Sequence, residues 1–195
     1  MTITHVNRKQ QTYYLHQGKT KTGKPRYFFS MKTEGDLVDT IPDGFEIYEN
    51  PNAQVFLRKI QPKLITDDEI TLVKKGIKKY SKTQNFLIDV KKEAISIFTS
   101  NQNESALSEL LTATASFYSR TEKDVQQLLA RSLTYSSELR FILVDKQKRH
   151  FQTERYCYLG AIDDWIQIGP PDQLATLVKT YVKHLGQESF YDLRY

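Results

Sequence analysis

Short aromatic and apolar segments separated by turn residues fill positions 11–60, and this pattern restricts the fold more than any other. The segments are residues 13–16, 26–29, 45–48 and 55–57. Two aromatic runs joined by a polar loop that contains glycine are typical of a β-hairpin. We therefore expect a small antiparallel sheet of three or four strands, with Leu37 and Val38 as an edge piece.

The region after Pro62 mixes helical and strand patterns. Thr66 and Glu69 have the spacing of a capping box, and apolar residues then repeat on one helical face up to Tyr80. Further helices are expected over 104–117, 121–133 and 174–185. Strands are expected over 86–90, 94–98, 139–145, 151–159 and 165–168, and Trp165 is expected to anchor the core under the last helix.

These patterns predict an α+β fold. A small N-terminal antiparallel sheet, over about residues 1–60, precedes a larger α+β domain over 61–195, in which helices cover one face of a second antiparallel sheet. A chain of 195 residues with 39% hydrophobic content is long and apolar enough to bury a core.

Positive charge is concentrated at the amino end. The first 33 residues contain no Asp or Glu but seven cations: Arg8, Lys9, Lys19, Lys21, Lys24, Arg26 and Lys32. Residues 34–60 are acidic, with six Asp or Glu against Arg58 and Lys59. Such asymmetry indicates an oriented electrostatic field, which favours an anionic partner for the N-terminal region.

A nucleic-acid interface is the leading hypothesis for this basic region. Cations in a hairpin loop can neutralise phosphates, while a neighbouring ring stacks on a base. The residues we expect to bind are Lys19, Lys21, Lys24, Arg26 and Tyr27. Two alternatives stay open: the loop is an ordinary solvated turn, or the acidic 34–60 segment neutralises it.

A second basic cluster is expected in the turn between two later strands. It comprises Lys146, Lys148, Arg149 and His150, of which Lys146, Lys148 and Arg149 are the expected nucleic-acid contacts. Its value as a nucleic-acid contact depends on whether it faces the same side of the molecule as the N-terminal loop.

The remaining sequence points to a non-enzymatic binding protein, RNA or DNA being the leading partner. Cys157 is the only cysteine and is expected to be a buried, unreactive thiol, and the four histidines have no metal-site spacing. We expect no catalytic residue, metal or cofactor. No apolar run is long enough for a membrane span, and the N-terminus lacks a signal-peptide pattern, so a cytoplasmic location is expected.

Two other function classes remain. One is a protein-interaction subunit that uses an edge of the N-terminal sheet or the aromatic tail over 190–195. The other is a metal-dependent nuclease, because Asp89 and Lys91 are spaced two apart at a strand end. Such a site needs another carboxylate, and Asp67 or Glu69 is the nearest in sequence.

The N-terminal pattern also resembles a module of uncharacterised bacterial proteins. The resemblance is carried by residues 13–29, which read YYLHQGKTKTGKPRYFF, by residues 46–52, and by residues 185–190 near the carboxyl end. It implies a shared module, but no activity, ligand or catalytic residue is attached to it.

Overall fold

The computed structural model describes residues 1–83, 85–100, 109–113, 121–159 and 161–193. The fold is α+β, as predicted, with small antiparallel sheets followed by a larger antiparallel sheet. The chain forms two compact units, one of residues 1–60 with 102–134 and the other of 61–101 with 135–195.

The first unit begins with a three-stranded antiparallel sheet in the order β1-β2-β3. The strands are β1 (Thr4–Val6), β2 (Thr12–Lys19) and β3 (Pro25–Ser30). Leu37 forms an isolated bridge with His16, and the Val38 amide donates to the Leu15 carbonyl at 2.9 Å. The expected edge piece therefore lies beside β2.

The two following strands form a sheet of their own instead of joining the first one. They are β4 (Phe45–Glu49) and β5 (Val55–Lys59), paired antiparallel. The first sheet therefore has three strands, within the expected three or four, and the segments over 45–48 and 55–57 pair with each other.

The first unit also contains helix α3 (Glu122–Ser132). Thr121 caps it, because its hydroxyl accepts from the Asp124 amide while its own amide donates to the Asp124 carboxylate. Of the helix expected over 104–117, residues 109–113 are helical, and the rest lies outside the described residues.

The second unit is built on an antiparallel sheet in the order β10-β9-β8-β7-β6, with a short strand, β11, also paired to β9. The strands are β6 (Phe86–Lys91), β7 (Ala94–Ser100), β8 (Tyr135–Asp145), β9 (His150–Leu159), β10 (Ile162–Gln167) and β11 (Asp172–Gln173). The expected hairpin and strand meander are both present.

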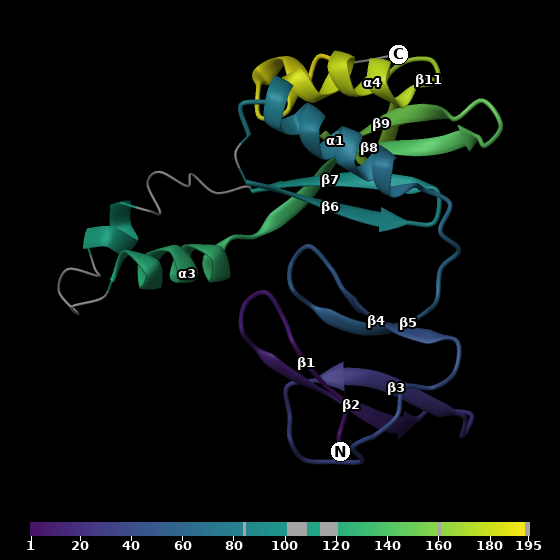
Figure 1. Cartoon of the computed structure of the whole chain (residues 1–195), viewed down its shortest axis with the longest axis vertical. Helices are drawn as coiled ribbons and strands as arrows, with labels where there is room; N and C mark the ends of the chain where they lie inside the picture. Colours follow the sequence, from purple (N-terminus) through teal and green to yellow (C-terminus); the bar gives the residue numbers. More distant parts are fainter. Residues whose placement is uncertain (84, 101–108, 114–120, 160, 194–195) are drawn as a thin grey trace. The chain divides into compact units, whose positions relative to one another are not determined.

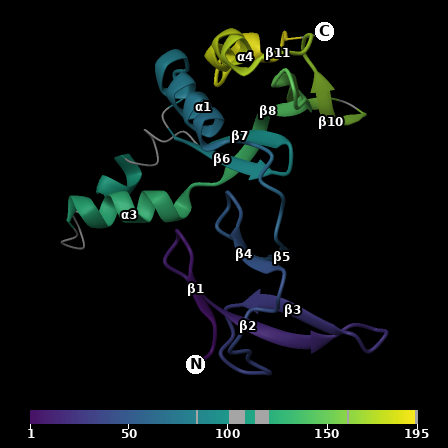
Figure 2. The same ribbon diagram turned by 45° about the vertical axis from the view of Figure 1, so that its right-hand side comes forward.

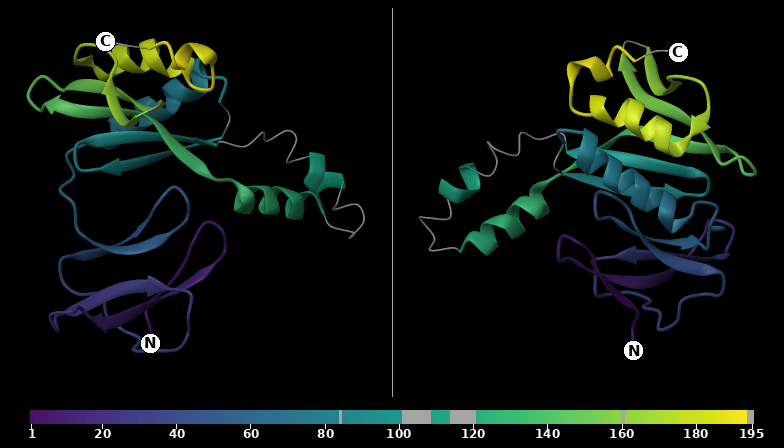
Figure 3. Two further views of the ribbon diagram at one scale, coloured as in Figure 1. Left: turned by 180° about the vertical axis from the view of Figure 1, so that it is seen from behind. Right: turned by 45° about the horizontal axis from the view of Figure 1, so that its top comes forward.

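Helices α1 (Asp67–Tyr80) and α4 (Leu174–Tyr181) cover one face of this sheet (Figure 1, Figure 2). They also lie side by side, as Figure 3 shows. The α1 capping box is the one that the sequence predicts. The last helix is shorter than expected, because its final turn, Val182–His184, is a 3₁₀-helix.

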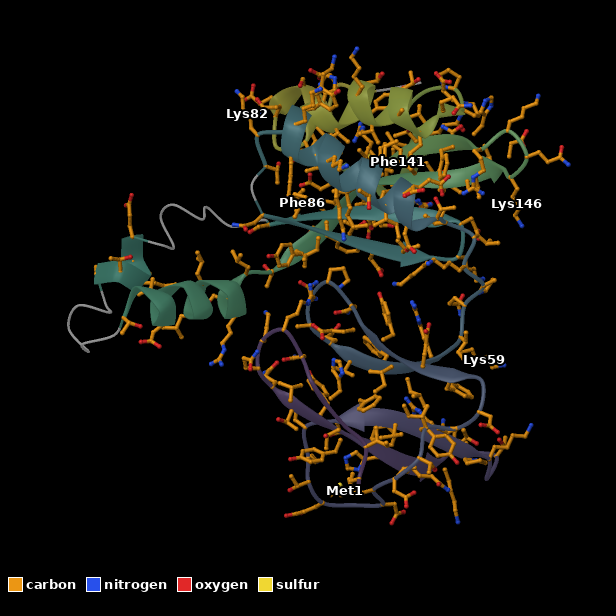
Figure 4. All side chains as sticks on the ribbon, in the orientation of Figure 1. Met1, Lys59, Lys82, Phe86, Phe141 and Lys146 are labelled. Carbon is orange, nitrogen blue, oxygen red and sulfur yellow. The ribbon has the colours of Figure 1, made fainter. Side chains whose placement is uncertain are left out.

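The core lies between the sheet and the two helices. Alternate residues of the strands point into it, including Ile95, Ile97, Leu139, Phe141 and Phe151, and they meet apolar residues of α1 and α4. Figure 4 labels Phe141 in this layer. None of the described helices combines the length and apolar character that crossing a bilayer requires.

The expectation for Trp165 was wrong. Ile168, just after β10, belongs to the core and Ile166 packs against it, whereas Trp165 is half-buried outside that cluster and contacts Tyr156 and Arg140. Side chains alternate between the two faces of a strand, so a one-residue change of register reverses the face.

Candidate nucleic-acid interface

The β2–β3 hairpin presents the N-terminal lysines on a loop held by its own backbone. Lys19 and Pro25 are the last register partners. Inside them, the Thr20 amide donates to the Lys24 carbonyl at 2.8 Å, and the Gly23 amide donates to the Thr20 carbonyl at 2.9 Å. Gly23 has φ +80°, which suits glycine. The loop is therefore ordered by bonds that leave its lysine side chains unused.

The cations of this hairpin are exposed, and no acidic side chain among the described residues pairs with them. Lys19, Lys21, Lys24 and Arg26 are all exposed. Over the part of the chain that the structure describes, none of these four forms an ion pair. The alternative in which the acidic 34–60 segment neutralises the loop is therefore not supported by any ion pair among the described residues.

The acidic segment instead neutralises other cations of the first unit. Glu49 pairs with Arg8 at 2.7 Å and contacts His5 at 3.1 Å, and Glu46 pairs with Arg58 at 2.9 Å. Burial acts to raise the pKa of Glu49, but hydrogen bonds from Arg8 and His5 outweigh it and leave the pKa below its usual value. Arg8 is therefore used inside the molecule.

An exposed aromatic ring lies beside these free cations. Phe28 is 40% exposed, and the Arg26 guanidinium lies 6.0 Å from its ring centroid. On the other strand, the ring of His16 stacks on Phe28 with centroids 5.5 Å apart and planes 12° apart. The buried His16 is itself fixed by a 3.0 Å hydrogen bond with the Lys32 carbonyl. Phe28 is thus held from behind while its ring remains accessible.

The structure separates Tyr27 from Arg26 by strand alternation. Arg26 and Phe28 point to one face of β3 and Tyr27 to the other, where it is half-buried. Sequence reasoning selected Tyr27 and missed Phe28. Because side chains alternate along a strand, Arg26 and Phe28 share a face of β3. The sequence therefore groups these two residues, but it does not say which face is buried.

A pocket between β3 and β5 is lined by residues from both faces of β3. Its volume is about 550 Å³, and its lining includes Arg26, Tyr27 and Phe28 from β3 and Phe56 from β5. Phe56 is 44% exposed and stacks on Tyr48 with ring centroids 6.3 Å apart. The first unit therefore offers an aromatic pocket next to unpaired positive charge.

The second basic cluster lies in the β8–β9 turn of the other unit, where Figure 4 labels Lys146. Lys146 and Lys148 are exposed. The turn is ordered by Asp145, whose carboxylate accepts from the amides of Gln147 and Lys148 at 2.9 Å each. The amide hydrogen bond from Lys148 is the main cause that lowers the pKa of Asp145.

Arg149 is engaged in a structural contact. Its guanidinium donates to both carboxylate oxygens of Glu69 at 2.6–2.9 Å and to the Leu64 carbonyl at 3.2 Å. Glu69 also caps α1 through the Thr66 amide. Burial acts to raise the pKa of Glu69, but the hydrogen bonds from Arg149 and Thr66 lower it overall. Arg149 thus ties the β8–β9 turn to the start of α1.

The residues of the nuclease hypothesis are also used in local contacts. Asp89 is 8% exposed and lies 3.3 Å from the Lys91 ammonium, while Glu69 is paired with Arg149. Within the described ranges, no three His, Cys, Asp or Glu side chains come together as a possible metal site. Cys157 is buried, with 6% of its surface exposed.

The aromatic tail is docked through residues 190–193. Phe190 is 3% exposed, and Arg155 donates to the Leu193 and Tyr191 carbonyls at 2.8 and 3.1 Å.

Comparisons with known proteins add no information on the site, since no family model, curated protein or solved structure matches this chain.

Proposed function

We propose that the protein binds nucleic acid through the basic hairpin surface, defined as Lys19, Lys21, Lys24, Arg26 and Phe28 with the adjoining pocket between β3 and β5. The observation that carries this proposal is the absence of ion pairs at these four cations among the described residues, next to an exposed ring. Exposed cations gain most from a phosphate chain, because binding releases its counterions.

A single-stranded ligand fits this surface best. The rings of Phe28 and Phe56 line the pocket and are exposed, and exposed rings stack on bases that have left a duplex. The lysines of the loop then hold the phosphates that flank the stacked base. The β8–β9 turn contributes Lys146 and Lys148 at most, since the Arg149 guanidinium is paired with Glu69.

The test is fluorescence anisotropy of labelled single-stranded and double-stranded oligonucleotides at low and physiological salt. We expect binding at low salt, tighter for the single strand. Replacing Lys19, Lys21 and Lys24 by alanine should weaken it at least tenfold, and Phe28→Ala should cost about 1–3 kcal/mol of binding free energy if a base stacks there.

A matched control removes the same charge elsewhere. Lys74, Lys78 and Lys82 are exposed residues of the second unit, at and just after α1. Their triple alanine variant should keep most of the affinity. Equal losses in the two triple variants would mean that net charge alone causes binding, and no binding of the wild type at low salt would refute the proposal.

The protein-interaction alternative has less support, because Phe190 of the aromatic tail is buried in the second unit and does not present its ring to a partner. Its sheet-edge form predicts a mass above that of the monomer in size-exclusion light scattering. We also propose a cytoplasmic location, since a chain with a single cysteine forms no intrachain disulfide and suits a reducing compartment.

A further inference from the structure

The sheet of the second unit splits where β8 and β9 diverge. β8 pairs with β7 from Tyr135 onward, but its pairing with β9 starts only at Leu139 and Arg155. Beyond Arg155, β9 pairs with β10 alone. Figure 3 (left) shows β8 continuing away from β9. Both strands, β10 and the tail line a pocket of about 850 Å³ in this unit.

A β-bulge places Glu138 in this pocket. Ile97 pairs with Leu139 while Phe98 pairs with Ser137, so Glu138 is the extra residue of β8. Bulges of this kind redirect a side chain that regular pairing would leave on the opposite face. Glu138 hydrogen-bonds Thr99, which is 3% exposed, through one carboxyl oxygen.

The other carboxyl oxygen lacks a partner. Among the residues that the structure describes, Glu138 Oε2 and the neighbouring Ser137 Oγ have no hydrogen-bond partner, and both atoms are closed to solvent. Arg155 lines the same pocket, but its guanidinium donates to carbonyls of the tail, and none of the ion pairs among the described residues joins it to Glu138. Burial raises the pKa of Glu138, and the Thr99 hydrogen bond offsets this only in part. A buried acceptor without a donor is costly, so a side-chain rotation that brings the Glu138 carboxyl to a ligand donor in the pocket is favoured.

Aromatic rings form much of the remaining wall. Tyr156 and Trp165 hold each other edge to face, with centroids 5.3 Å apart. Tyr158 and Tyr191 line the same pocket and are 81% and 67% exposed, so rings are available to a ligand from solvent. Aromatic walls around a carboxylate are suited to cations with an apolar body.

We propose that this pocket binds a small organic cation, an amine or amidine on a planar apolar body, whose N–H groups donate to the Glu138 carboxylate after its side chain turns toward the pocket. The planar body lies against the Tyr156 and Trp165 wall, and Tyr158 covers its outer side. This site is independent of the basic hairpin surface, because every residue that lines it belongs to the second unit.

Three probes of one shape test the proposal on the full chain. Benzamidine is cationic, benzamide is its neutral counterpart and benzoate is anionic. Calorimetry or amide chemical shifts should detect benzamidine at millimolar concentration, benzamide at least about tenfold weaker, and no benzoate. Equal binding of benzamidine and benzamide, or no binding of benzamidine, would overturn the proposal.

Variants locate the site. Glu138→Gln preserves the side-chain volume and should weaken the binding of benzamidine at least tenfold. Glu93→Gln, in the distant β6–β7 turn, should leave this affinity unchanged. Tyr158→Ala changes an exposed ring and should weaken binding severalfold, which keeps the test decisive if Glu138→Gln does not fold. Wild-type affinity in either Glu138→Gln or Tyr158→Ala would contradict the assignment.

Discussion

Single residues decide which charges remain available on this protein. Arg8 and Arg149 look equivalent to Arg26 in the sequence, yet both form ion pairs with glutamates, over 41 and 80 residues of separation. Sequence patterns describe neighbours along the chain, so they predict the capping role of Glu69 but not its pairing with Arg149. Likewise, the choice between Tyr27 and Phe28 depends on which face of β3 is buried.

The Glu69–Arg149 pair predicts a pH-dependent stability. The pKa of Glu69 is lowered from 4.5 in the folded protein, so its stabilisation is present above that value and is lost as pH falls through the lowered pKa. Arg149→Gln should reduce the unfolding free energy by about 1–3 kcal/mol at neutral pH.

Urea denaturation at several pH values measures this. The difference in unfolding free energy between the wild type and Arg149→Gln should become smaller as Glu69 becomes protonated. Lys148→Ala, in the same turn, serves as the control and should stay within about 0.5 kcal/mol of the wild type. A difference that is constant with pH would show that the ion pair is not its cause.

At the scale of elements, hairpins and capped helices were predictable because their signals are local. The β2–β3 loop, the Thr66 capping box and the β6–β7 turn all depend on residues within a few positions of one another. The Glu138 bulge and the separate β4–β5 sheet depend on which strands become neighbours, and local patterns do not contain that information.

The contact between α1 and α4 predicts an unusual effect of alanine in a helix. Gly76 is buried in α1, and a Cβ atom there would lie 2.1 Å from Val178 Cγ1 of α4. Alanine normally favours a helix over glycine, but this overlap with a β-branched side chain has little room to relax. Gly76→Ala should therefore destabilise the protein by about 1–3 kcal/mol.

Thermal or urea unfolding checks this, with Lys74→Ala on an exposed position of α1 as the control. A second Val178→Ala substitution should recover part of the loss, because it removes the overlapping methyl group. Additive losses in the double variant would show that the two side chains do not conflict.

At the scale of the whole molecule, the second unit is assembled from two chain segments, 61–101 and 135–195. Ser100 and Tyr135 are register partners at the end of the β7–β8 ladder. A short turn can therefore join them without disturbing the sheet.

This arrangement predicts that the second unit folds alone. A variant containing residues 61–100 and 135–195 joined by Asn-Gly, a turn that suits a two-residue hairpin, should unfold cooperatively and give dispersed amide signals. The same fragment with residues 101–134 retained is the comparison. A disordered spectrum from the shortened variant would show that the sheet needs the first unit.

The salt dependence of oligonucleotide binding tests the central claim most directly. If Lys19, Lys21, Lys24 and Arg26 each neutralise a phosphate, the logarithm of the binding constant should fall with the logarithm of salt concentration with a slope of about −3 to −4. Removing the three lysines should reduce the slope by about 2–3, while the Lys74, Lys78 and Lys82 variant keeps it. A wild-type slope that the hairpin variant leaves unchanged would contradict the account.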